Sequence, residues 1–170
     1  IELDESGKRK ITTSYRFINR KDFSKDLVAK IIDELIAEGC GVIAASKTFS
    51  VDGMEEELLI KEAGKEKGIE VCAASEISKL YGLTRRTRTS VINGSILPRM
   101  ISTADSTEDA VKKAGIEAPL MIMRGDGGVM DIEEMRNRPV LTMLSGPAAS
   151  TVGALMYLRV SNGIFFEVGG

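Results

Sequence analysis

The chain contains no histidine among its 170 residues. A Ser–His–Asp triad, a Cys–His dyad and a histidine-ligated metal centre are therefore excluded within this stretch of sequence. Cysteine is also scarce, since only Cys40 and Cys72 occur. Both lie beside short apolar runs, so we expect two reduced, buried thiols rather than a disulfide framework or a zinc site. This usage favours a cytoplasmic location.

Long apolar runs and a strong charge of one sign are missing too. No segment reaches the roughly 20 apolar residues that span a bilayer, and no basic-then-apolar N-terminus resembles a signal peptide. Charged residues make up 28% of the chain and apolar residues 43%, with a net charge of −2. These values are typical of a soluble globular protein and predict no membrane partner and no nucleic-acid partner.

Hydrophobic periodicity predicts alternating strands and helices in the first half. Residues 11–19, 41–46 and 69–74 have strand patterns, and a helical pattern lies in each interval between them. Asp52 and Glu55 have the spacing of a capping box for the second helix. The order predicts an α/β fold with a parallel or mixed sheet.

The second half begins with a basic helix. Residues 83–100 carry four arginines and no acidic residue, and Pro98 kinks or ends the helix. Such a helix either binds phosphate or RNA, or is solvated between two lobes, and the lack of interleaved aromatics favours the second. Asp105 and Glu108 predict a separate helix start. Strands are expected at 120–123, 140–144 and 164–168, and helices at 131–137 and 148–158.

Arg124-Gly125-Asp126-Gly127-Gly128 forms a side-chain-poor turn after a predicted strand. Glycine lets a ligand phosphate approach the main chain closely. Asp126 either binds a metal ion or a substrate N–H, or closes the turn through an Asx-type hydrogen bond. The embedded Arg-Gly-Asp triplet also occurs in adhesion motifs, but nothing else in the sequence indicates a secreted, disulfide-stabilised protein.

Two further turns follow predicted strands. Ser145-Gly146-Pro147 opens a helix, whose first N–H groups either bind an anion or only allow close packing. The run Glu167-Val168-Gly169-Gly170 is either an ordinary turn or a carboxylate next to an anion-binding nest. Loops beyond the carboxyl ends of neighbouring strands meet in one crevice, so the three turns together predict a site for a nucleotide phosphate with its Mg²⁺.

Three runs carry a family resemblance: L-M-I-M-R-G-D-G-G-V-M, R-P-V-L-T-M-L-S-G-P-A-A-S-T-V-G-A and F-E-V-G-G. Together they resemble the hydantoinase/oxoprolinase family, and R-T-R-T-S-V-I-N-G-S-I-L-P resembles the stretch that joins this family's N-terminal region to its main domain. The resemblance implies that residues 1–88 end the N-terminal region, 89–103 form a connecting helix and 104–170 begin the main domain. The implied fold is that of the actin/Hsp70/sugar-kinase group (ribonuclease H-like), whose lobes clasp ATP.

The resemblance also implies which residues bind the nucleotide. The phosphates would lie against Gly127, Gly128, Ser145, Gly146, Gly169 and Gly170. Glu167 would take the acidic position of the family's Asp-Met-Gly-Gly-Thr-Ser motif, acting in catalysis and on Mg²⁺ or its waters, with Asp126 as a second catalytic carboxylate. Glu167 in place of Asp is a departure, as are Arg124 and Asp126 in the glycine turn and the lack of a histidine in 47–53.

The activity implied by the resemblance is an ATP-dependent hydrolase that opens cyclic amides such as hydantoins or 5-oxoproline. A cyclic amide, and a second subunit or a second copy of the chain, are the expected partners. The alternative is a nucleotide-binding relative without hydrolase activity: a kinase-like biosynthetic protein, a carboxylase or a regulatory subunit. A third is a domain that only packs between subunits. Because one phosphate loop is absent, we expect the chain to be an inactive piece of a longer protein.

Overall fold

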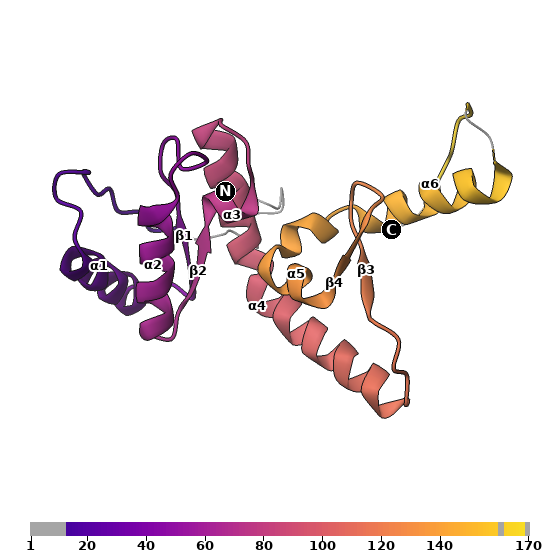
Figure 1. The fold of residues 1–170 in the computed structure, drawn as a ribbon, viewed down its shortest axis with the longest axis horizontal. Helices are drawn as coiled ribbons and strands as arrows, with labels where there is room; N and C mark the ends of the chain where they lie inside the picture. Colours follow the sequence, from indigo (N-terminus) through magenta and orange to yellow (C-terminus); the bar gives the residue numbers. More distant parts are fainter. Residues whose placement is uncertain (1–12, 160–161, 169–170) are drawn as a thin grey trace. The chain divides into compact units, whose positions relative to one another are not determined.

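The computed structural model describes residues 13–159 and 162–168. They belong to two compact units, Ile1–Ser95 and Ile96–Gly170, and the division lies within the stretch 89–103 predicted to connect two lobes. Figure 1 shows the fold with colours that follow the sequence from the N-terminus (indigo) to the C-terminus (yellow). No helix in the described part of the chain is both long and apolar enough to cross a membrane.

The first unit is a βαβ arrangement with helices on both faces of a small sheet. Strands β1 (Val42–Ala45) and β2 (Glu70–Ala73) pair in parallel, with Val42 opposite Glu70. This confirms the parallel pairing expected for the strand patterns at 41–46 and 69–74. The helices are α1 (Lys25–Ala37), α2 (Glu55–Glu66), α3 (Ala74–Ile77) and the first part of α4 (Leu83–Lys113).

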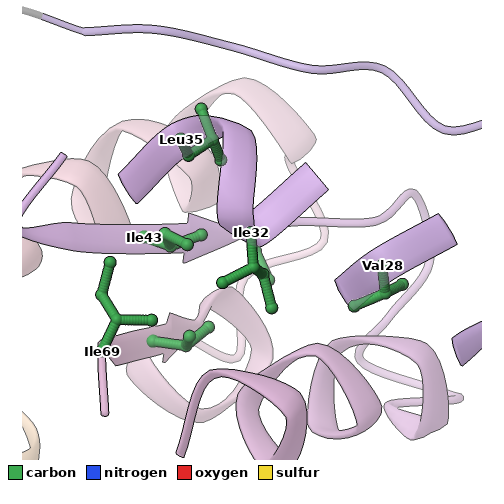
Figure 2. Close-up of a cluster of buried hydrophobic side chains, with 7 residues drawn as sticks. Val28, Ile32, Leu35, Ile43 and Ile69 are labelled. Carbon is green, nitrogen blue, oxygen red and sulfur yellow. The ribbon is translucent and has the colours of Figure 1, made fainter. Parts of the chain in front are cut away.

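One face of this sheet packs against α1 and α2. Val28, Ile32 and Leu35 recur at helical spacing on α1 and meet Ile43 of β1 and Ile69 beside β2, as Figure 2 shows. Apolar side chains of α2 complete this cluster. Ser24 begins α1, because its hydroxyl accepts a hydrogen bond from the Leu27 N–H.

The other face packs against the beginning of α4. A Cβ built at Gly94 would lie 3.1 Å from Cγ1 of Val42, and the Ser90 hydroxyl donates to the Cys72 carbonyl over 3.2 Å. Successive strand residues point to opposite faces, so β2 directs Val71 to one helix layer and Cys72 to the other. The Cys72 thiol is free and buried, as expected, and its burial raises its pKa. Cys40 is free as well but only partly buried, so the expected burial holds for one of the two thiols.

Two predictions for this unit are wrong. Residues 13–19 of the expected strand at 11–19 form no strand, and Tyr15 and Phe17 are exposed. Partial alternation does not make a strand where no neighbouring strand supplies hydrogen bonds. The capping box is wrong as well, because Met54 precedes α2 without a side-chain cap and Asp52 instead accepts a hydrogen bond from the Tyr81 hydroxyl.

The second unit contains an antiparallel hairpin, which confirms the strand predicted at 120–123 and adds a second strand that was not predicted. Strands β3 (Met121–Met123) and β4 (Val129–Asp131) place Ile122 opposite Met130. Met130 packs with Ala104 of α4 and with Met135. The remaining elements are α5 (Ile132–Asn137), the 3₁₀ helix η1 (Pro139–Thr142) and α6 (Ser145–Leu158).

The helix start predicted at Asp105 is wrong, since α4 continues from Leu83 to Lys113 with Pro98 inside it. Asp105 and Glu108 both pair with Arg136 of α5, at 2.7 and 2.8 Å. The capping-box spacing was therefore misleading, because i,i+3 residues also share one face of an uninterrupted helix.

Two strands predicted in this unit are also wrong. Residues 139–142 form η1, where Pro139 takes the first helical turn, so the expected strand at 140–144 does not form. Residues 164–168 are neither strand nor helix, and Phe166 is 85% exposed. Short apolar runs do not distinguish these conformations by pattern alone.

The hairpin turn closes through its own hydrogen bonds. The Arg124 N–H donates to the Gly128 carbonyl over 2.8 Å, and the Gly127 N–H donates to the Arg124 carbonyl over 3.1 Å. The Gly128 N–H donates to Oδ1 of Asp126 over 3.0 Å, and the Arg124 guanidinium pairs with Oδ2. The Gly128 N–H and then the Arg124 charge lower the pKa of Asp126. Gly127 adopts a φ of +84°, which glycine accepts without strain.

Gly64 sets how closely α2 approaches β2. A Cβ at this position would lie 2.2 Å from Cγ2 of Val71 and 3.1 Å from the Ile69 carbonyl oxygen. We expect Gly64→Ala to lower the free energy of unfolding by about 1–2 kcal/mol, because the clash outweighs the gain in helix propensity. Denaturant unfolding measures this. Gly41→Ala is the control, since its Cβ would meet nothing within 4 Å, and equal stability of the two variants would contradict the packing.

The lowered pKa of Asp126 predicts an acid-sensitive turn. Its carboxylate stabilises the turn at neutral pH, and this contribution is lost as the pH falls through the lowered folded-state pKa. NMR titration should give a carboxyl pKa below that of an ordinary aspartate, with a coupled shift of the Gly128 amide. The Asp126→Asn variant keeps an acceptor oxygen and should show no such transition. An ordinary aspartate pKa would contradict the assignment of these contacts.

Candidate functional site

The glycine turn lies against the segment that leads into α6. The Gly125 N–H donates to the Leu141 carbonyl over 2.8 Å. A Cβ at Gly125 would lie 2.0 Å from the Met143 carbonyl oxygen, and one at Gly127 would lie 2.9 Å from Cγ2 of Val152 on α6. These glycines are therefore required for close approach, and the glycine turn packs against residues on both sides of the Ser145-Gly146-Pro147 turn within one unit.

The donors of the glycine turn are already occupied. The N–H groups of Arg124, Gly125, Gly127 and Gly128 all donate to acceptors within the chain, as described above. Both carboxylate oxygens of Asp126 are likewise engaged. The turn thus has the geometry of a packing and closing element, which agrees with the Asx-turn interpretation of Asp126.

The beginning of α6 has the opposite character. Its N-cap residue, Leu144, has left-handed backbone angles (φ 60°, ψ 20°) and provides no side-chain cap. The Ala148 N–H bonds back to the Leu144 carbonyl over 3.2 Å, whereas the N–H groups of Ser145 and Gly146 meet no acceptor within 13–159 and 162–168. No acidic residue lies in the first turn, and a Cβ at Gly146 would meet nothing within 4 Å. The helix therefore presents open donors at its positive end.

Glu167 lies beside the same helix. Its Oε1 accepts a hydrogen bond from the Ser150 hydroxyl at 3.3 Å, and its side chain is exposed. Ser150 follows Ser145 by five positions, or about 7.5 Å along the helix axis. A carboxylate therefore lies on the first turns of α6. Gly169 and Gly170, which were expected to face a phosphate, lie outside the described residues.

A protein-only metal cage is not found in the described part of the chain, where no three Cys, Asp or Glu side chains gather. Mg²⁺ at nucleotide sites uses one or two carboxylates together with phosphate oxygens and waters. One exposed carboxylate such as Glu167 fits that requirement, whereas Asp126 is occupied by its turn.

A buried polar cluster in the first unit escaped the sequence interpretation. It centres on Glu57, 1% exposed, and Arg86, 0% exposed. The spacing of Arg86, Ser90, Asn93 and Leu97 marks one face of a helix, and all four are buried. This helical spacing is the sequence signal for the buried face, whereas the four arginines of 83–100 indicate a solvated helix instead.

Comparisons with known proteins agree with this architecture. A family model described as hydantoinase/oxoprolinase matches residues 86–170, which is half of the chain. An uncharacterized protein of Methanocaldococcus jannaschii is 29% identical over 105 residues, covering 60% of this chain and 15% of that protein.

Two solved structures are similar across both units. A nucleotide-free acetone carboxylase superposes with a TM-score of 0.66 and 23% identity, covering 79% of this chain and 20% of its own. An ATP-dependent caprolactamase from Pseudomonas jessenii gives a TM-score of 0.71 and 23% identity, covering 85% of this chain and 22% of its own. The chain thus spans about a fifth or less of these relatives. At this identity the two structures establish the shared fold, and the sequence match establishes kinship: the chain belongs to the hydantoinase/oxoprolinase family.

Proposed function

We propose that this chain is part of an ATP-dependent enzyme that opens a cyclic amide, and that the beginning of α6 binds the nucleotide phosphates. The observation that carries the proposal is the pair of N–H groups at Ser145 and Gly146 that have no acceptor among the described residues. Helix N-termini attract anions because such donors and the helix dipole act together.

The strained conformation of Leu144 supports this assignment. A bulky residue with φ of 60° is uncommon, and such strain concentrates at functional sites. Here it leads directly into a first turn that has neither a cap nor an acidic residue.

Glu167 is proposed as the magnesium-side and catalytic carboxylate. It lies beside α6 through Ser150, which is more than one helical turn after the open donors. Gly169 and Gly170 are proposed to extend the phosphate contacts. Direct phosphate binding by Gly127 and Gly128, and catalysis by Asp126, stay predictions that require the internal bonds of the turn to be exchanged.

When bound, ATP would supply a phosphoryl group that activates the amide oxygen, so that water can attack the ring carbonyl. The residues of this chain would hold and orient the reactants. Ser145 and Gly146 donate hydrogen bonds to phosphate oxygens, which positions the nucleotide without a charged side chain. Glu167 fixes the metal waters and balances the positive end of the helix.

The two α/β units are proposed to belong to the two-lobed fold of the actin/Hsp70/sugar-kinase group. We further propose a cytoplasmic enzyme that works with a second subunit or a second copy. Because the relatives are much longer, the activity belongs to the full-length protein, and the 170-residue chain by itself is expected to be inactive.

A carboxylase is the second candidate. The similarity to an acetone carboxylase covers 79% of this chain, and that enzyme carboxylates acetone in an ATP-dependent reaction. A nucleotide-binding relative without hydrolase activity is the remaining alternative.

The first test is ATP hydrolysis by the full-length protein. We expect a cyclic amide, chosen from hydantoin, 5-oxoproline and caprolactam, to stimulate phosphate release in the presence of Mg²⁺. Acetone with bicarbonate is the parallel arm. If acetone with bicarbonate stimulates phosphate release and no cyclic amide does, the carboxylase replaces the hydrolase. If ATP hydrolysis is the same with and without each of these compounds, only the nucleotide-binding alternative is left.

The second test separates phosphate binding from helix stability. Ser145→Asp places a carboxylate at the positive end of α6, which favours the helix but repels phosphate. We expect the KM for ATP to rise about 10-fold or more, with no loss of stability. Gly153→Asp lies in the middle of α6, where a Cβ would meet nothing within 4 Å, and serves as the matched charge control. Equal ATP affinity in the two variants would remove Ser145 from the site.

A further inference from the structure

In the first unit, two buried charged side chains from neighbouring helices hold the loop after β1. Glu57 of α2 accepts a hydrogen bond from the Lys47 N–H at 2.7 Å, and its other oxygen accepts from the N–H and hydroxyl of Ser75 at 2.8 and 2.6 Å. Arg86 of α4 donates to the carbonyls of Lys47, Leu80 and Tyr81. Both main-chain polar groups of Lys47 are therefore held by buried ions, and removing either ion would leave main-chain groups unpaired.

These contacts fix two loops at one edge of the sheet. Residues 46–54 leave the carboxyl end of β1, and residues 78–82 follow α3 after β2. The Tyr81 hydroxyl donates to Oδ1 of Asp52 at 2.9 Å and so ties the loops a second time. In α/β sheets, ligands bind beyond the carboxyl ends of parallel strands, so a rigidly held loop at this edge is well placed for recognition.

The tip of the first loop is strained and displays an aromatic ring. Phe49 has a φ of 57° and is 66% exposed, whereas the next residue, Ser50, is 0% exposed. The Ser50 hydroxyl meets no hydrogen-bond partner among the described residues. An exposed phenylalanine gains nothing from burial in this unit, and its left-handed backbone costs free energy that the anchored loop must offset.

The charges around this tip disfavour an anion. Three glutamates, Glu55, Glu56 and Glu57, occupy the first turn of α2, and Lys47 is paired with Glu56. Glu57 and Arg86 are fully used by main-chain and hydroxyl groups. What the loop offers a ligand is the face of an aromatic ring, which stacks on flat, uncharged groups.

We infer that Phe49 binds the ring of an uncharged cyclic amide, such as hydantoin or caprolactam, and helps to determine substrate specificity, an inference that rests on the proposed function. The loop at 46–54 is then the substrate-recognition element of the first unit. Glu57 and Arg86 are positioning residues, because they act on the ligand only through the main chain of Lys47.

The test uses Phe49→Asn in the full-length protein, because asparagine tolerates the left-handed conformation while removing the ring. We expect the KM for the cyclic amide to rise about 5- to 10-fold, with the KM for ATP unchanged and the thermal midpoint unchanged or raised. Phe49→Tyr should restore the KM. Phe17→Asn is the control, since Phe17 is an exposed ring outside this loop.

The outcomes separate this inference from the proposed function. If a cyclic amide stimulates ATP hydrolysis and Phe49→Asn leaves its KM unchanged, the inference is overturned while the proposed function stands. A loss of stability with equal changes in both KM values would assign Phe49 a structural role and also overturn it. If no cyclic amide is turned over, the proposed function fails first and the inference fails with it.

Discussion

The structure depends on how main-chain polar groups are satisfied where its short elements end. A buried N–H or C=O without a partner is costly, so each loop must supply one. In the first unit, Glu57 and Arg86 provide partners for the loop after β1. In the second, the turn at 124–128 satisfies itself. At the start of α6 the Ser145 and Gly146 donors stay open in the described part of the chain, and these donors give the candidate site its chemistry.

Elements with a strong period were predictable from the sequence. The helical spacing of Val28, Ile32 and Leu35 and the apolar runs at 41–46 and 69–74 gave the parallel pair and its helix layer. Short apolar runs were not predictable, because Val140–Thr142 has the same pattern whether it forms a strand or, as observed, part of η1 after Pro139. The strand predicted at 164–168 does not form, because no partner strand pairs with it among the described residues. Strand pairing is a non-local property that one segment does not encode.

The site was predictable in part. The glycine turn and the Ser145–Pro147 turn were identified from composition, and the structure packs Gly125 against Met143 and Gly127 against Val152, which lie on either side of the second turn in the sequence. Their roles were not evident, because a glycine that admits a phosphate and a glycine that admits a neighbouring carbonyl look identical in sequence. The left-handed Leu144 and the buried Glu57 were not predicted either. Leucine rarely has a positive φ and glutamate is rarely buried, so the residue type does not indicate these states.

The proposed division of chemistry follows charge. The open helix end in the second unit favours an anion, whereas the three glutamates that begin α2, directly after the loop at 46–54, disfavour one. The most direct measurement is a crystal structure of the full-length protein with Mg²⁺ and a non-hydrolysable ATP analogue. The account predicts phosphate oxygens about 3 Å from the Ser145 and Gly146 nitrogens. Phosphates bound elsewhere, with those two N–H groups capped by another part of the protein, would contradict it.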